Sequence, residues 1–488
     1  MACINYELHA WQACASWSVL AGIVEMEIAS LPQELLLHVL SFLPPGDLLR
    51  CRATCRRWRD LAVLPALWRH KNLDAYAKRD SELVAAAMRL VPCLHKLWVS
   101  PWSTCWDSLG AVLPWTNCAV SHLHLGINLS DAVLVTAVLG RQAALGKLKH
   151  LNVYSCDEVN KKSLSKVHQL LEFLLHTQGL ESIVINIGAD PADIMKGKSP
   201  LLNAAKSAAP VPASLRKLVY CSTLRDPCLP RHLEWHAATL EVVELRVYHP
   251  GVTPLLAALP RLRELQCTLL EDMPALLQCP SLKKVHLLVN LDSSPKASTL
   301  GVAEYLRAAV SRLEELVLEF SDSEYRGKAT NLVLSLAGSR HAAQTLRSLT
   351  LKDEDDDIST LQATLPPLAA ILHRLKALVT LHVPNMSNDL LDALDGDALP
   401  NLEQLSFNSP ERCPHEWIHG EQVRAVLGRC PRLHLLMNSF HDLGSVSQYC
   451  LEHTCHDLPA SSRCTLFSHP KNECCGVKHI GEEIHISL

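Results

Sequence analysis

Three groups of residues in this 488-residue chain have the types and spacing of metal or phosphate chemistry. The first is His415, Glu416 and His419, an HExxH pattern in which one helix would present two imidazoles to zinc beside a carboxylate base. Pro414 precedes the pattern and Gly420 follows it, so a helix here would be about one turn long. We expect no metal there, and a metallo-hydrolase at His415 and His419 stays an alternative that stoichiometric zinc would support.

The second group, Gly197-Lys198-Ser199, has the end of a phosphate-binding loop, but Ala192 stands where the first glycine of that loop belongs. The third is a C-terminal tail whose ligand-type side chains are spaced irregularly rather than in close pairs. We expect no catalytic residue, no cofactor and no metal in this chain. The tail residues are Cys450, His453, Cys455, His456, Cys464, His469, Cys474, Cys475 and His479.

The segment 31–68 has the pattern of a compact set of short helices. Its apolar residues recur at helical spacing from Leu35 onward, and a proline suits the first turn of a helix, where the missing N–H has no partner anyway. Pro44-Pro45-Gly46 ends this first helix, and Asp47 is placed to cap the next. A second apolar face then runs on to Trp68.

This segment resembles the F-box. The resemblance covers about forty residues and rests on residue types in order and spacing, namely Leu31, Pro32, Glu34, Leu35, Val39, Phe42, Leu43, Asp47, Leu48, Cys55, Trp58, Leu61, Leu67 and Trp68. It implies a docking site for the Skp-family adaptor of a cullin–RING ubiquitin ligase, and through that adaptor a cullin. The residues expected to contact the adaptor are Leu31, Pro32, Glu34, Leu35, Leu36, Val39, Leu43 and Leu48.

Beyond the F-box, a short Leu-x-x-Leu-x-Leu pattern with substitutions recurs at intervals of roughly 20 to 35 residues. Each copy predicts one strand, and the stretch between copies predicts a helix. Such a unit cannot bury its apolar face alone, so stacked copies would share one core. The copies begin at Leu94, Val120, Leu148, Leu180, Leu215, Val242, Leu262, Leu282, Leu313, Leu346, Leu378 and Leu402, with a degraded copy at Leu433.

These copies resemble long, irregular leucine-rich repeats, which implies a horseshoe-shaped α/β solenoid. The asparagine or cysteine that usually follows each strand is mostly missing here, which predicts a weak side-chain ladder and uneven curvature. In each strand the leucines point into the core, so the residues between them face the concave side. Among those we expect Trp98, Tyr154, Arg246 and Tyr248 to bind a substrate protein, because aromatic and arginine side chains are the usual interface anchors.

Composition fits this picture. Hydrophobic residues make up 48% of the chain and the net charge is −4, so neither extensive disorder nor nucleic-acid binding is expected. The 19 cysteines are scattered, which indicates a reducing compartment and hence the cytoplasm, the nucleus or both. No stretch predicts a membrane span or a signal peptide. Translation starting at Met26 would place the F-box almost at the N-terminus.

The expected organisation is an N-terminal extension at 1–25, an F-box at 26–74, a leucine-rich-repeat solenoid at 75–444 and a Cys/His-containing tail at 445–488. The acidic run 353–357 is expected to be an exposed loop, because like charges repel. The resemblance implies a non-catalytic substrate-recognition subunit of an SCF-type ubiquitin ligase, whose substrate the sequence does not name. The alternative is a protein-interaction scaffold that does not lead to degradation.

Overall fold

The computed structural model describes residues 31–101, 103–157, 159, 163–188, 209–222, 227–289, 296–320, 326–338, 345–353, 362–408, 421–430, 432–440, 463–468 and 483–485. The HExxH pattern at 415–419, the segment 197–199 and the N-terminal extension 1–25 lie outside the described residues. So does the acidic run after Asp353. In the tail, only the strand residues around Cys464 and a short segment at 483–485 are described.

Four short helices form the N-terminal region. They are α2 (Gln33–Ser41), α3 (Pro45–Cys51), α4 (Arg56–Leu61) and α5 (Pro65–Trp68). Prolines at the start of α3 and α5 cost no hydrogen bond, because the first N–H groups of a helix have no partner within it. Trp68 is fully buried, and its indole N–H donates to the carbonyl of Ala62 at 2.6 Å, which holds α5 against the end of α4.

The rest of the described chain is built on one 16-stranded sheet whose strands follow each other in sequence order. Neighbours from β1 to β14 are parallel, β14 and β15 are antiparallel, and β15 and β16 are parallel. The strands are β1 (Asn72–Ala75), β2 (Cys93–Val99), β3 (Ala119–Ile127), β4 (His150–Ser155), β5 (Ser182–Asn186), β6 (Lys217–Tyr220), β7 (Val242–Leu245), β8 (Glu264–Thr268), β9 (Lys284–Val289), β10 (Glu315–Phe320), β11 (Ser348–Asp353), β12 (Thr380–Val383), β13 (Gln404–Asn408), β14 (His434–Phe440), β15 (Arg463–Ser468) and β16 (Glu483–His485).

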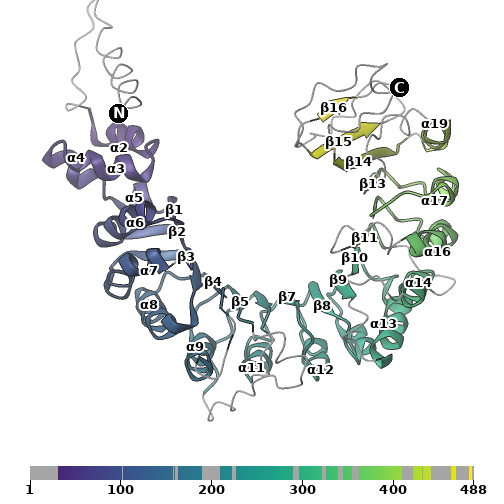
Figure 1. Cartoon of the computed structure of the whole chain (residues 1–488), viewed down its shortest axis with the longest axis horizontal. Helices are drawn as coiled ribbons and strands as arrows, with labels where there is room; N and C mark the ends of the chain where they lie inside the picture. Colours follow the sequence, from purple (N-terminus) through teal and green to yellow (C-terminus); the bar gives the residue numbers. More distant parts are fainter. Residues whose placement is uncertain are drawn as a thin grey trace, which may run out of the picture.

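Figure 1 shows these strands along the inner side of a curved arc, with the helices along its outer side. The α-helices are α6 (Lys78–Leu90), α7 (Ser103–Leu109), α8 (Ala132–Leu145), α9 (Leu164–His176), α11 (Cys228–Trp235), α12 (Thr253–Ala257), α13 (Lys296–Ala309), α14 (Arg326–Ser335), α16 (Leu365–Ile371), α17 (Asn388–Ala393) and α19 (Glu421–Arg429). Short 3₁₀ turns are η2 (Leu113–Trp115), η3 (Leu129–Asp131), η4 (Met273–Gln278), η5 (Gln362–Thr364) and η6 (Leu372–Arg374). The predicted mixed class, with a helical N-terminal region before a parallel sheet, is confirmed, and the arrangement is consistent with a repeat solenoid.

One hydrophobic core runs from Leu36 in α2 to Leu435 in β14. The alternating leucines of each strand supply it, as the repeat pattern predicts. The sixth copy, which our prediction began at Val242, is out of phase with the structure. In the structure Val243 and Leu245 are buried, whereas Val242 is half-buried and lies in register with Lys217. Two adjacent valines made both phases plausible, and the neighbouring strands decide between them.

The entries to the strands from β5 to β13 carry a backbone ladder. The carbonyl of Glu181, for example, accepts from the N–H groups of both Arg216 and Lys217, at 2.8 and 3.0 Å. The carbonyl of Arg216 then accepts in the same way from Glu241 and Val242. These paired bonds fix the register of each unit on the one before it.

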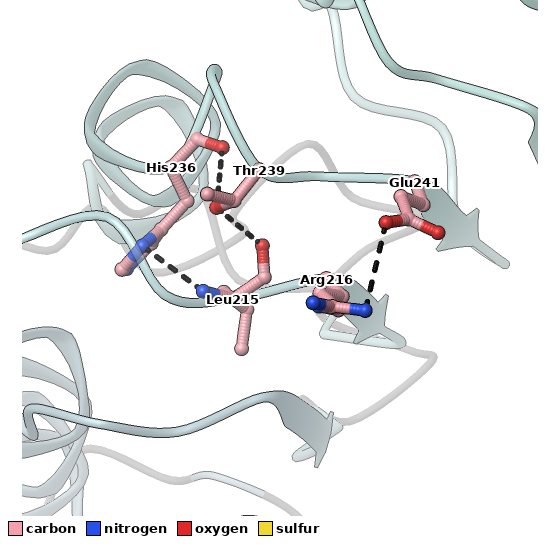
Figure 2. Close-up of polar contacts among 5 residues, drawn as sticks. All are labelled: Leu215, Arg216, His236, Thr239 and Glu241. Atoms are coloured by element: carbon pink, nitrogen blue, oxygen red, sulfur yellow. Dashed lines mark hydrogen bonds and ion pairs between the residues drawn. The ribbon is translucent and has the colours of Figure 1, made fainter.

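Hydroxyl side chains reinforce this ladder at the same level, as Figure 2 shows for β6 and β7. The Thr239 hydroxyl donates to the Leu215 carbonyl at 2.8 Å, the His236 ring accepts from the Leu215 N–H at 3.5 Å, and Arg216 lies 3.9 Å from Glu241. Ser214 and Thr345 make the equivalent bonds to the carbonyls of Leu180 and Leu313. A hydroxyl ladder at the strand entries therefore ties successive units together.

The sheet begins earlier than expected. β1 starts at Asn72, inside the segment 26–74 that we assigned to the F-box, and it pairs with β2. The Lys71 ammonium donates to the carbonyls of Ser41 and Leu43 at 2.9 and 2.8 Å. The helical region and the sheet are thus joined by a side chain as well as by a shared core.

Candidate functional site

Apolar side chains form an exposed row on α2. Leu35 and Val39 on α2, and Phe42 at its C-cap, are 51%, 48% and 75% exposed, whereas Leu36 and Leu40 on another face of the helix are fully buried. The three exposed residues are spaced by four and three positions, so they share one helix face. A contiguous exposed apolar row on a helix marks an interaction surface more often than isolated exposed residues do.

Other residues expected to contact an adaptor fall into two groups. Leu36 and Leu48 are fully buried, so in this structure they hold the helices together and do not offer contact surface. Pro32 and Glu34 are exposed, and Leu31 and Leu43 are half-buried. Phe42, which is absent from our expected contact set, has the most exposed side chain of the row. Its large size and its place three residues after Val39 were the available signal.

The start of α2 is held from a distance. The Arg57 guanidinium, on α4, donates to the Leu31 carbonyl at 2.6 Å. Pro32 precedes the helix in an extended conformation, with φ −50° and ψ 148°. The Leu31-Pro32 pair is therefore anchored to α4, and this contact orients the start of α2 relative to α4.

A second candidate surface lies on the inner face of β1–β4. Trp98 is its centre, with the His124 ring stacked on it at 5.3 Å and an interplanar angle of 5°. The rings of Tyr76 and Tyr154 lie 5.8 and 6.5 Å from Trp98. The Lys96 ammonium lies 5.2 Å from the centre of the Trp98 ring, within cation–π range.

Three more imidazoles stack alongside. The His122 ring lies 4.0 Å from His150 and 4.3 Å from His95. The parallel register explains this, because Lys96, His122 and His150 are paired across β2, β3 and β4. We call Tyr76, His95, Lys96, Trp98, His122, His124, His150 and Tyr154 together the histidine–aromatic cluster.

Burial and mutual repulsion favour the neutral forms of His122, His124 and His150. Burial lowers the pKa of His124 to about 4, and the positive charge of Lys96 adds to that effect. The pKa values of His122 and His150 are also lowered, in both cases chiefly by burial, with His95 disfavouring the charged form of each. At neutral pH these three rings are therefore uncharged, and each can become positively charged by taking up a proton.

Gly126 makes room for the aromatic part of the cluster. It lies opposite Tyr154 in the register of β3 and β4. A Cβ atom at this position would lie 2.7 Å from the Tyr154 ring and 2.7 Å from the Pro101 nitrogen, closer than real contacts allow. The missing side chain lets the Tyr154 ring lie across β3, near Trp98.

Of the four substrate-binding residues expected from the sequence, the structure brings two together. Trp98 and Tyr154 belong to the histidine–aromatic cluster. Arg246 and Tyr248 follow β7, which β5 and β6 separate from β4. Arg246 is exposed, whereas Tyr248 is half-buried against the core, where burial and a hydrogen bond with Glu271 raise its pKa. Tyr76, which our set lacked, follows β1, a strand that the repeat pattern did not reveal.

Ion pairs cover the inner face farther along the arc. Lys217 lies 2.6 Å from Glu244, and Lys284 lies 3.6 and 3.2 Å from Glu264 and Glu315. Glu319 lies 2.7 Å from His286 and 2.5 Å from Lys352, and together these two partners outweigh its burial and lower its pKa. These charges on β6–β11 are thus matched among themselves.

The described residues contain no group of three or more His, Cys, Asp or Glu side chains placed to hold a metal ion. In the same part of the chain, no helix has the length and apolar character needed to cross a bilayer. No disulfide bond joins the cysteines whose side chains are described.

Comparison with known proteins identifies the N-terminal region. The F-box-like family model matches residues 28–74. F-box only protein 33 of Homo sapiens is 55% identical over 40 residues, which are 8% of this chain and 7% of that protein. F-box only protein 17 of Rattus norvegicus is 57% identical over 44 residues, 9% and 18% of the two chains. F-box/LRR-repeat protein 5 of Danio rerio is 47% identical over 45 residues, 9% and 7% of the two chains.

These matches span only a small part of each relative, so they support a relationship only for the N-terminal region of this chain. That region holds the exposed apolar row of α2 and the buried core of the four short helices. Residues 28–74 are an F-box-like domain, and this chain has homologues among F-box proteins.

Proposed function

We propose that this chain is the substrate-recognition subunit of an SCF-type ubiquitin ligase. F-box proteins are generally subunits of this kind, and F-box domains generally bind a Skp-family adaptor. The observation that carries the proposal is the exposed apolar row Leu35, Val39 and Phe42 on α2 of the F-box-like domain. Leu31, Pro32, Glu34 and Leu43 border this row, and the adaptor would link the chain to a cullin.

The repeat array would hold the substrate. We infer an irregular leucine-rich-repeat solenoid of the horseshoe kind, because parallel strands line the inside of the arc and helices the outside. Its inner face would bind a substrate protein, with Trp98 and Tyr154 as anchors and Arg246, directly after β7, as a second contact point. The chain would do no bond chemistry and use no cofactor. It would raise the effective concentration of substrate lysines near a ubiquitin-conjugating enzyme, in the cytoplasm, the nucleus or both.

The test is affinity purification from cells with quantitative mass spectrometry, comparing wild type with Val39→Asp and Val133→Asp. Both valines are exposed on helices, at 48% and 61%, but Val133 lies on α8 of the repeat array. We expect the adaptor and a cullin with wild type and Val133→Asp, and their loss with Val39→Asp. Equal recovery with all three proteins would contradict docking through α2.

Recovery of no adaptor with any of the three would remove the ligase proposal altogether. Proteins retained by Val39→Asp would be substrate candidates. A candidate that accumulates when this chain is depleted supports the receptor role. If the cellular level of every retained partner is unchanged when this chain is depleted, a protein-interaction scaffold that does not lead to degradation replaces the receptor role.

A further inference from the structure

The histidine–aromatic cluster differs in charge from the rest of the inner face. The described lysines on β6, β9 and β11 are paired with glutamates at 2.5 to 3.6 Å. Lys96 forms no ion pair among the described residues, and its ammonium lies over Trp98 instead. Lys96 therefore brings to this end of the arc a positive charge that no described carboxylate pairs with.

The imidazoles beside Lys96 are close enough to repel one another once charged. His122 lies between His95 and His150, at 4.3 and 4.0 Å. The titratable and charged groups that face these rings from β1 to β4 and from the strand entries are Asp74, Tyr76, Lys96, Lys149, Tyr154 and Glu181. Glu181 is already held by Lys149 at 3.1 Å, and the exposed Asp74 acts on His124 and not on His122 or His150. Neither carboxylate is therefore free to balance protons added to His122 and His150.

We propose that the histidine–aromatic cluster binds an acidic segment of the substrate protein, with carboxylates facing Lys96, His122 and His150 and an apolar side chain against Trp98 and Tyr154. This deepens the proposed function, on which it rests for the identity of the bound protein as a substrate. A carboxylate beside the stacked rings favours their charged forms. Binding then takes up protons, and affinity rises as the pH falls.

The side chains present favour carboxylates over phosphates. Phosphorylated motifs are generally read by clusters of arginine, whose planar fork binds two oxygens at once. Strands β1–β4 contain no arginine and one lysine. The aromatic rings add surface for an apolar neighbour of the acidic residues, because Tyr76 is 53% exposed and the rings of Trp98 and Tyr154 are half-buried.

The experiment measures fluorescence polarisation of the full chain with a short labelled peptide rich in glutamate around one central tryptophan. Its counterparts carry glutamine, or phosphoserine at matched total charge. We expect the glutamate peptide to bind at least about tenfold more tightly at about pH 6 than at about pH 8, and the glutamine peptide to show no such change. Glutamate itself does not titrate in this range.

The variants are the double substitution His122→Gln and His150→Gln, and Lys96→Met. His382→Gln is the control, since it removes an inner-face histidine on β12 that is hydrogen-bonded to Ser406 at 2.8 Å. The double variant is expected to lose the pH dependence, and Lys96→Met to lower affinity at both pH values. His382→Gln keeps wild-type binding. Melting curves confirm that each variant is folded.

Equal binding of the glutamate and glutamine peptides, or unchanged binding by the variants, would overturn the proposal. A phosphoserine peptide that binds about tenfold more tightly than the glutamate peptide would overturn the choice of carboxylate. Since the assay contains no adaptor, its failure leaves docking through α2 untouched. Failure of that docking likewise leaves the peptide result standing.

Discussion

The side chain of Lys71 donates a hydrogen bond to the backbone carbonyl of Leu43 at 2.8 Å, across the boundary between the F-box-like domain and the sheet. The backbone carbonyl of Lys71 also accepts from the N–H of His95 at 3.1 Å. One residue thus binds both the end of α2 and the start of β2. Together with the continuous core, it holds the exposed row of α2 and the histidine–aromatic cluster in one fixed relation.

We predict that Lys71→Met loosens this junction. Methionine keeps most of the aliphatic stem but leaves the Ser41 and Leu43 carbonyls without their donor. Because the first bond is exposed and the second partly buried, the free energy of unfolding should fall by about 0.5 to 1.5 kcal/mol. Hydrogen exchange should speed up selectively in α2 and α3. Lys376→Met is the matched control, because Lys376 is exposed and far along the array. Equal exchange in both variants would show that the shared core alone fixes the junction.

Changing Leu31 and Pro32 together to alanine is predicted to weaken adaptor binding about tenfold or more and to leave the repeat array folded. The pair sits where Arg57 holds the chain at the start of α2. Its loss frees that start without touching the strands. Titration against purified adaptor measures the effect, with the melting curve as the check on folding. Wild-type affinity in the double variant would refute a role for this pair.

The strands were predictable because an alternating leucine pattern determines which residues of each strand face the core. Most predicted copies overlap a strand, and the pattern failed where it was ambiguous or short. Val242 and Val243 offered two phases, and only pairing with Lys217 on β6 separates them. β1 contributes just Leu73 and Ala75 to the core, too few to count as a copy.

Contacts between side chains were harder to predict from the sequence than the strands were. Trp98 and Tyr154 could be chosen as anchors by type, but their proximity depends on the register across β3 and on the missing side chain at Gly126. The weak side-chain ladder we expected is replaced by hydroxyls at the strand entries, such as Ser214 and Thr239. A serine or threonine directly before the first leucine of a copy was the signal available in the sequence.

The hydroxyl ladder yields a prediction of its own. Thr239→Val keeps the side-chain shape but removes the hydroxyl that bonds to the carbonyls of Leu215 and His236, at 2.8 and 3.2 Å. The free energy of unfolding should therefore fall by about 1 kcal/mol. Thr136→Val is the control, because the Thr136 hydroxyl bonds to Ala132 within its own helix. Urea denaturation compares the two. Equal loss in both would mean that the bond between units adds nothing beyond an ordinary side-chain contact.

The last prediction concerns His232 on α11, which is fully buried. Among the described residues neither of its ring nitrogens has a hydrogen-bond partner. Burial lowers its pKa to about 3, with smaller contributions from His236 and His176. The unfolded chain, in which a histidine titrates near pH 6.5, therefore binds more protons than the folded chain between about pH 6.5 and about pH 3. Stability is present above pH 6.5 and is lost as the pH falls through this window.

His232→Leu removes that proton uptake, so the variant should lose less stability than wild type on acidification. Between about pH 7 and about pH 4.5 the difference should approach 2 to 3 kcal/mol, measured by urea denaturation at both pH values. His373→Leu, at an exposed position on η6, controls for the general effect of losing a histidine. If His232→Leu and wild type lose the same amount of stability as the pH falls, proton uptake by His232 on unfolding does not contribute to the loss of stability in acid.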